Sequence, residues 1–245
     1  IARCSLGKPG EFYSEELLYQ MFGINAELLI DHAWGYESCT IAQIRAYKPQ
    51  SSSLGCGQVL HCPYTADKAR IVVQEMIDGI SLELVEKRLV TDQLVLTVGY
   101  DIENLTRPEI RKVYKGPVTT DRYGRRVPKH AHGTWNLPRA TSSSSELLEA
   151  MAALYDKIVN PALLIRRMSL SACHVVNEKM AKEREQKETF EQLDLFTDYA
   201  KKEAKEKEEQ KKRERERRMQ EALLTIKKKY GKNAVLRGMN FEEGA

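Results

Sequence analysis

The fold is decided by residues 65–100, which read TADKARIVVQEMIDGISLELVEKRLVTDQLVLTVGY. Up to Leu89 the apolar residues recur at helical spacing and form one stripe: Ala69, Val72, Val73, Met76, Ile77, Ile80 and Leu84. From Gln93 to Tyr100 they alternate, which predicts a strand with Leu94, Leu96, Val98 and Tyr100 on one face. The sequence therefore places a long amphipathic helix directly before a half-buried strand.

The pattern continues on both sides of this stretch as strand, helix, strand, strand, helix, strand, beginning at Leu54. The second helix starts in a serine cluster where Ser143 and Glu146 fit a capping box, and the last strand covers about 163–175. A βαββαβ order predicts an α+β fold in which a four-stranded antiparallel sheet carries two helices on one face. The opposite face would then be free for a ligand.

Changes in composition divide the chain into four segments. Residues 1–48 predict a small helical domain, with short helices ended by Gly23 and Gly35. The run YKPQSSS has the composition of a linker, which we place at 49–53, ahead of the sheet domain at 54–177. Residues 178–245 hold 19 Lys/Arg and 16 Asp/Glu, which predicts a solvated helix or a disordered tether.

Overall composition excludes some classes of protein. The formal net charge is only +4, so a nucleic-acid partner can be argued only from clustered charge. The cysteines are odd in number and lack zinc spacing, so we expect reduced thiols in a cytoplasmic protein: Cys4, Cys39, Cys56, Cys62 and Cys173. No stretch approaches the ~20 apolar residues that span a bilayer, so no membrane partner is expected.

Positive charge is clustered between the second and third strands. Residues 107–132 hold eight Lys/Arg against two carboxylates, a net charge of +6. Its prolines and glycines predict a loop without helix, rich in donors for phosphates: Arg111, Lys112, Lys115, Arg122, Arg125, Arg126 and Lys129. A flexible basic loop that binds nothing is the alternative, but the adjoining uncovered sheet face favours DNA.

The last strand carries Arg166 and Arg167 side by side, so the two are predicted to point to opposite faces, with one of them facing DNA. Ser169 and Ser171 share the Arg167 face and are small enough to let a phosphate backbone approach. An ordinary solvated strand face is the competing interpretation.

A five-residue segment stands out in the charged tail: Gln192, Leu193, Asp194, Leu195 and Phe196. It lacks apolar partners at helical spacing, which favours an extended peptide whose Leu195 and Phe196 enter an apolar pocket. The alternative is a short apolar patch on a helix. A coiled coil or RNA-binding arm is a weaker interpretation of the tail, which lacks sustained apolar heptads.

Residues for catalysis are not recognised in the sequence. It contains no P-loop, no nucleophile elbow, no Ser/His/Asp set and no carboxylate pair suited to two magnesium ions. His130 and His132 lack neighbours at ligand spacing, so a metal site is not expected. We expect this chain alone to bind no cofactor and to catalyse no nucleotide transfer.

Several stretches together resemble bacterial Y-family (UmuC/DinB-type) translesion DNA polymerases. GKPGEFYSEELLYQMFGINAELLIDHAWGYES is similar to their thumb, and SSSLGCGQVL, YTADKARIVVQEM, TDQLVLTVGYD, KHAHGTWNL and LLIRRMSLSACHV are similar to their little-finger domain. QLDLF is similar to the motif that binds the bacterial sliding clamp. Together with AVLRGMNFEEGA, it points to the error-prone UmuC-like branch of Gram-positive bacteria.

The resemblance implies a DNA-binding and clamp-binding C-terminal part of a polymerase of SOS mutagenesis. It implies DNA contacts from Ser52, Ser53, Gly55, Arg166 and Arg167, and contacts with the clamp β subunit from Gln192, Leu193, Leu195 and Phe196. The family's Mg²⁺-binding carboxylates lie in a palm that this sequence lacks, so we expect a piece of a longer chain. The alternative is a free-standing, non-catalytic accessory protein that binds DNA and the clamp, which an upstream start codon would favour.

Overall fold

The computed structural model describes residues 1–47, 52–121, 123–188, 199–231, 233–236 and 238. It divides into two compact units, Ile1–Gln50 and Ser51–Ala245. The linker predicted at 49–53 lies partly outside the described residues, because only Ser52 and Ser53 of it are placed.

The first unit is helical and small. It contains the 3₁₀ helix Cys4–Leu6 and the helices α1 (Glu15–Phe22), α2 (Asn25–Ala33) and α3 (Ile41–Ala46). Helix α1 ends at Gly23, whose φ of 58° belongs to the left-handed region that glycine tolerates. The fully buried apolar side chains that the described part of this unit contains are Leu18 and Ala26.

The second unit contains the sheet and the helices that cover it. Its elements in chain order are β1 (Leu54–Tyr64), α4 (Ala66–Lys87), β2 (Leu89–Tyr100), α5 (Glu103–Thr106), α6 (Pro108–Val113), β3 (Val118–Thr120), β4 (Arg126–Pro128), β5 (Ala131–Thr141), α7 (Ser144–Ile158), β6 (Ile165–Cys173), β7 (Val176–Asn177), α8 (Glu178–Glu188) and α9 (Tyr199–Tyr230). The predicted α+β class, with an antiparallel sheet, is confirmed.

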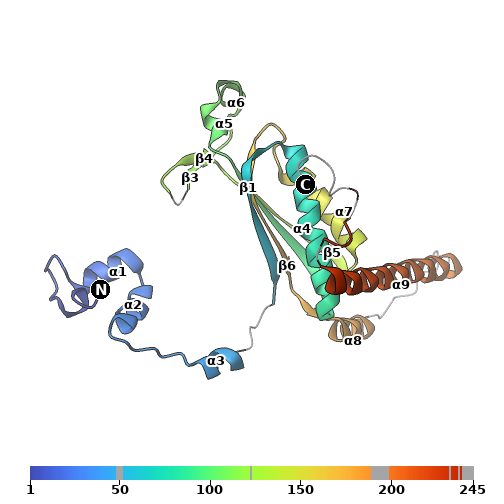
Figure 1. Cartoon of the computed structure of the whole chain (residues 1–245), viewed down its shortest axis with the longest axis horizontal. Coiled ribbons are helices and arrows are strands. Elements are labelled where there is room, and N and C mark those ends of the chain that lie inside the picture. Colours follow the sequence, from blue (N-terminus) through green and yellow to red (C-terminus); the bar gives the residue numbers. More distant parts are fainter. Residues whose placement is uncertain (48–51, 122, 189–198, 232, 237, 239–245) are drawn as a thin grey trace. The chain divides into compact units, whose positions relative to one another are not determined.

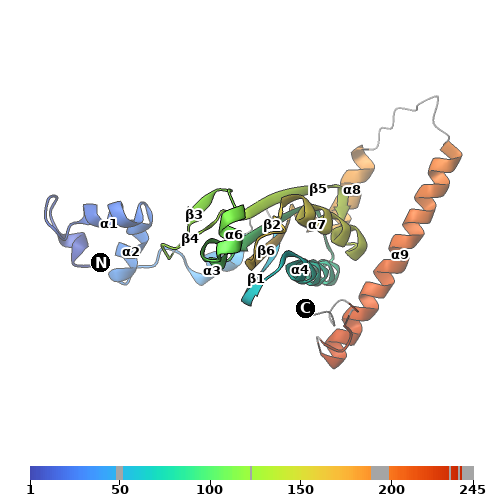
Figure 2. The same cartoon turned by 90° about the horizontal axis from the view of Figure 1, so that it is seen from above.

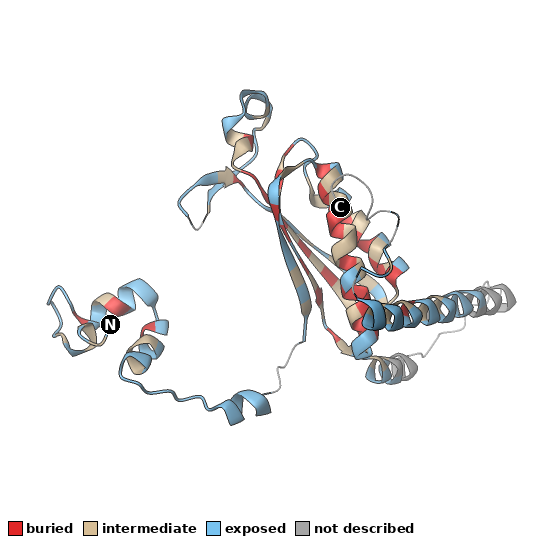
Figure 3. Cartoon of the chain, in the orientation of Figure 1, coloured by how far each residue is buried: buried red, intermediate tan, exposed pale blue. Residues whose placement is uncertain are grey.

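The strands are ordered β1-β6-β2-β5, each antiparallel to its neighbours, and the short β7 pairs with β2. Helices α4 and α7 lie together on one face of this sheet (Figure 1). The buried residues gather between these helices and the strands (Figure 3). The other face of the four long strands therefore remains outside the core.

The core forms where the two predicted apolar patterns meet. Leu94 and Leu96 of β2 are fully buried against Leu84 of α4 and Met151 of α7. Burial of side chains of this size stabilises the fold by roughly 1.5–3 kcal/mol each. Two polar contacts fix the helices: the Tyr155 hydroxyl donates to the Ala66 carbonyl at 2.7 Å, and the Ser81 and Ser144 hydroxyls lie 2.6 Å apart.

The excursion between β2 and β5 corrects one expectation. Residues 107–132 were predicted to exclude helix, but α6 begins at Pro108 and runs to Val113, followed by the hairpin β3–β4. Proline is tolerated at the first position of a helix because the amide hydrogen missing there has no helical partner. The basic segment is therefore a structured projection beyond the end of the sheet (Figure 1).

The tail is more than a solvated extension. Its helix α9 contacts α4, and Gln220 within it is only 2% exposed. Burial of a polar side chain in a charged segment follows from hydrogen bonds to another element, which the local sequence pattern does not reveal. No helix within the described ranges is both long enough and apolar enough to cross a membrane.

Candidate nucleic-acid interface

The face of the sheet opposite to α4 and α7, which we call the uncovered face because no described helix of the second unit packs on it, is formed by alternate residues of the four long strands. On this face Thr97 of β2 stands opposite His132 of β5 and Ser169 of β6, and Ser169 stands opposite Gly57 of β1. Most neighbouring positions on this face are polar or glycine, namely Gln93, Thr134, Asn136, Ser171 and Gly55, and Val95 is an apolar side chain among them. The face is thus shallow and able to form hydrogen bonds.

Glycines leave the β1 side of this face without protruding side chains. A Cβ atom on Gly55 would lie 2.9 Å from the Ser171 hydroxyl, closer than real contacts allow. Ser52 and Ser53 precede β1, and the Ser52 carbonyl accepts a hydrogen bond from the Val175 amide at 3.0 Å. These three predicted DNA contacts therefore gather at the start of β1, whereas Arg167 pairs with Val59 in the middle of that strand.

A register shift in β6 corrects the prediction for the two arginines. Arg167 pairs with Val59 and Gly99, whereas Ile165 pairs with Tyr64 and Tyr100, so Arg166 lies in an irregularity of the strand. Strict alternation fails at a bulge because the extra residue is not paired. Arg166 and Arg167 consequently line one hollow instead of pointing to opposite faces.

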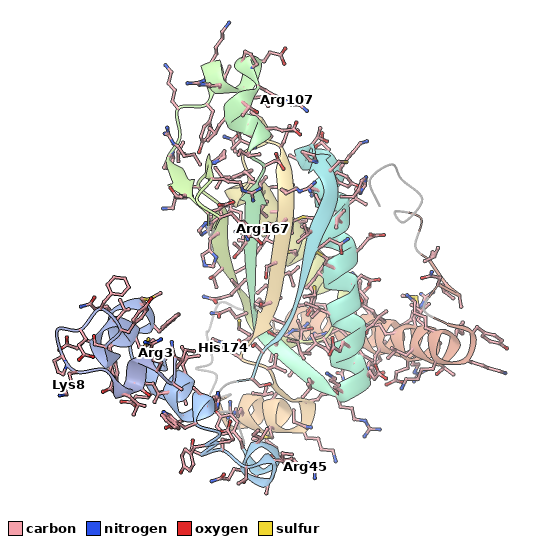
Figure 4. All side chains as sticks on the ribbon, turned by 60° about the vertical axis from the view of Figure 1, so that its left-hand side comes forward. Arg3, Lys8, Arg45, Arg107, Arg167 and His174 are labelled. Atoms are coloured by element: carbon pink, nitrogen blue, oxygen red, sulfur yellow. The ribbon has the colours of Figure 1, made fainter. Side chains whose placement is uncertain are left out.

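The stem of Arg167 rests on Gly99. A Cβ atom at Gly99 would meet the Arg167 Cγ at 2.6 Å and its Nε at 2.7 Å. The absence of a side chain at Gly99 therefore lets the guanidinium lie over the strand on the sheet face away from α4, as Figure 4 shows. Within the described residues, no carboxylate oxygen lies within 4 Å of the Arg167 guanidinium.

The hollow lies between the strand ends and the β3–β4 hairpin and has a volume of about 880 Å³. Its cationic wall consists of Arg125, Arg166 and Arg167, and His61 and His130 line it as well. Asp101, Glu103 and Asp121 also line it, so the hollow is not uniformly positive. Arg167 is the cation best placed to meet an incoming anion.

The other charges of the hollow are partly neutralised. Arg166 Nε lies 3.8 Å from Asp101, and Arg125 lies 2.8 Å from Asp121. Asp121 organises the hairpin turn by accepting hydrogen bonds from the backbone amides of Tyr123 and Arg125. Desolvation raises the pKa of Asp121, but these hydrogen bonds outweigh that effect and lower its pKa overall. The turn is therefore held with its carboxylate ionised.

The remaining predicted cations do not line the hollow. They are exposed side chains on α6, on the turn after it and on the β3–β4 hairpin: Arg111, Lys112, Lys115, Arg126 and Lys129. The Tyr114 hydroxyl and the Lys129 amide both donate to the Pro117 carbonyl at 2.8 Å, which braces this projection. Arg122 lies outside the described residues.

Sequence reasoning missed several residues of the hollow. His61 lies on β1 in the stretch where the pairing with β6 shifts, and Tyr123 lies in the hairpin turn with the Arg125 guanidinium 5.1 Å from its ring centre. His61 packs edge-on against Tyr64. His61 could have been found from strand alternation, because it lies two residues after Val59 and so on the same face of β1. No local sequence pattern indicates that the hairpin turn folds toward the strand ends.

The comparisons add little to this geometry. No family model matches the sequence, and no curated protein matches it. Among solved structures, the chain is similar to a complex of beta-clamp processivity factor and little finger domain of PolIV, with 9% sequence identity. The match covers 60% of this chain and 100% of that chain, with a TM-score of 0.33. This value is too low to establish a shared fold.

The predicted clamp motif, Gln192 to Phe196, lies outside the described residues. Its flanks are placed, because α8 precedes it and α9 follows it.

A substitution at Gly99 tests whether the Arg167 stem is held as described. Gly99→Ala should displace Arg167 and weaken binding of primer-template DNA by about threefold, because one phosphate contact is misplaced and not removed. Fluorescence anisotropy measures this change, with Gly79→Ala in α4 as the matched control, since a Cβ there meets nothing within 4 Å. Equal affinities for Gly99→Ala and the unmodified protein would contradict the role given to Gly99.

Proposed function

We propose that this chain binds primer-template DNA without sequence specificity and attaches to the sliding clamp, as the DNA-gripping part of an error-prone translesion DNA polymerase. The DNA-binding part of this proposal rests on one observation. The uncovered sheet face carries hydrogen-bonding side chains and glycines, and Arg166 and Arg167 lie next to them on β6. In this proposal, catalytic carboxylates and their Mg²⁺ come from a palm domain.

The arrangement suits a sugar-phosphate backbone more than base edges. The face is shallow, and its donors are hydroxyl, amide and imidazole groups spread over β2, β5 and β6. Contacts of this kind fix the position of a duplex without reading its sequence. The exposed cations of α6 and the hairpin extend the positive surface past the end of the strands. In this proposal they contact a second stretch of the DNA sugar-phosphate backbone.

The clamp-binding half is carried by residues 192–196. A short segment with Leu195 and Phe196 in a highly charged tail has the composition of a peptide that docks by its apolar side chains. Such a peptide would hold the DNA-binding unit near the clamp and raise its effective concentration at the primer terminus.

The salt dependence of DNA binding tests the first half. If about five phosphates are neutralised, log K falls against log salt with a slope near −4.5, so affinity drops about 20-fold between 50 and 100 mM salt. We expect this drop by fluorescence anisotropy, and the same affinity for two primer-templates of unrelated sequence. Undetectable binding, or affinity that does not change with salt, would overturn the DNA-binding proposal.

A further inference from the structure

The C-terminal half of α9 is held on the sheet unit by a set of polar contacts, which we call the latch. The latch consists of Glu216, Arg217 and Gln220 on α9 and the serines at the start of α7, namely Ser142, Ser143, Ser144 and Ser145. Figure 2 shows α9 as a long helix that passes beside α4.

Glu216 occupies the N-terminal end of α7. Its carboxylate accepts hydrogen bonds from the Ser143 hydroxyl at 2.7 Å, the Ser145 amide at 2.8 Å and the Ser145 hydroxyl at 2.9 Å. The free amides at a helix start favour a negative charge there. Glu216 thus provides, from a distant part of the chain, the acidic partner that caps α7.

Gln220 reaches deeper, one turn further along α9. Its side-chain amide donates to the Ser142 carbonyl at 3.1 Å and to the Ser144 hydroxyl at 2.8 Å, and Ser144 in turn contacts Ser81 of α4. A polar side chain that is 2% exposed is retained in such a position by its hydrogen bonds. The contact is therefore directional and specific to this register of α9.

Charged contacts continue along the same side of the helix. Arg217 lies 3.3 Å from Glu178, the first residue of α8, and Lys228 lies 2.7 Å from Glu86 of α4. The pairing with Lys228 lowers the pKa of Glu86. The Arg217–Glu178 pair joins positions that are 39 residues apart in sequence. It therefore ties α9 to the start of α8.

We infer that the serine-rich start of α7 is an intramolecular docking surface for α9, so that the tail is attached to the sheet unit at two places. One end is attached through β7 and the Glu178 amide, which donates to the Arg88 carbonyl at 3.1 Å. The other is attached through the latch.

Hydrogen exchange of the full chain, followed by mass spectrometry, tests docking without DNA or clamp. Glu216→Ala with Gln220→Ala should speed exchange about tenfold in residues 208–231 and in the first turn of α7, because the contacts that bind them are lost. Glu216→Gln keeps the shape and removes the charge, and should give a smaller increase at the same sites. Exchange in β6 should stay unchanged, which shows that the sheet unit remains folded.

Glu209→Gln is the matched control, because it removes one carboxylate from the same helix. Glu209 pairs with Arg213 within α9, so its loss should leave exchange in the first turn of α7 unchanged. Exchange in α7 that is identical in the double variant and the unmodified protein would overturn the inference. So would exchange in residues 208–231 of the unmodified protein at the rate of an unstructured chain.

Discussion

Replacing both Arg166 and Arg167 with alanine is expected to weaken binding of primer-template DNA by about 50-fold at 0.1 M salt. Each phosphate contact contributes about 0.9 to the slope of log K against log salt, so the double variant should bind with a slope smaller by about 1.8. Both side chains line the same hollow, and within the described residues Arg167 faces no carboxylate within 4 Å. Anisotropy titrations at several salt concentrations measure the affinity and the slope together.

The control removes two positive charges from the helical side of the same unit. Lys87 lies in the last turn of α4 and Lys157 in the last turn of α7, and neither lines the hollow. Lys87→Ala with Lys157→Ala should change affinity by less than about threefold, because it lowers the overall charge and breaks only an exposed pair of Lys87 with Glu83 within α4, without changing the lining of the hollow. Equal losses in the two double variants would mean that net charge, and not the hollow, governs DNA binding.

Truncation of the apolar pair in residues 192–196 is expected to abolish clamp binding. Leu195→Ala with Phe196→Ala removes two side chains whose burial is worth roughly 1.5–3 kcal/mol each, so affinity for the bacterial sliding clamp should fall by about 100-fold or more. DNA affinity should not change, because these residues carry no charge. Surface plasmon resonance with immobilised clamp measures the first quantity and anisotropy the second.

Met180→Ala with Met219→Ala is the matched control for that experiment. The two methionines are exposed apolar side chains of the tail, at 52% and 54%, and they flank the predicted motif on either side. Their truncation should leave clamp affinity within about twofold. If clamp binding persists after the Leu195 and Phe196 substitutions, the proposed clamp-binding role of residues 192–196 is contradicted. The DNA-binding proposal would not be affected by that result.

Sequence periodicity alone predicted the α+β class, the long helix α4 and the alternation of β2. It succeeded because burial of one face of a helix or strand requires apolar residues at a regular spacing, which can be seen within a short stretch of sequence. The uncovered face was anticipated for the same reason, since residues such as Thr97 and Ser169 occupy the positions left out of the apolar set. The apolar character of residues 192–196 is likewise local, so their clamp-binding role was predicted without a structure and stays a prediction.

Two features were decided only by the tertiary structure. Arg166 joins Arg167 in one hollow because the pairing of β6 shifts against both of its neighbours, and a register shift belongs to the pairing and not to one strand's sequence. Gln220 is buried because the start of α7, more than seventy residues away, provides its hydrogen-bond partners. Contacts between distant segments have no periodic signal, so only the folded chain reveals where the cations meet and where the tail docks.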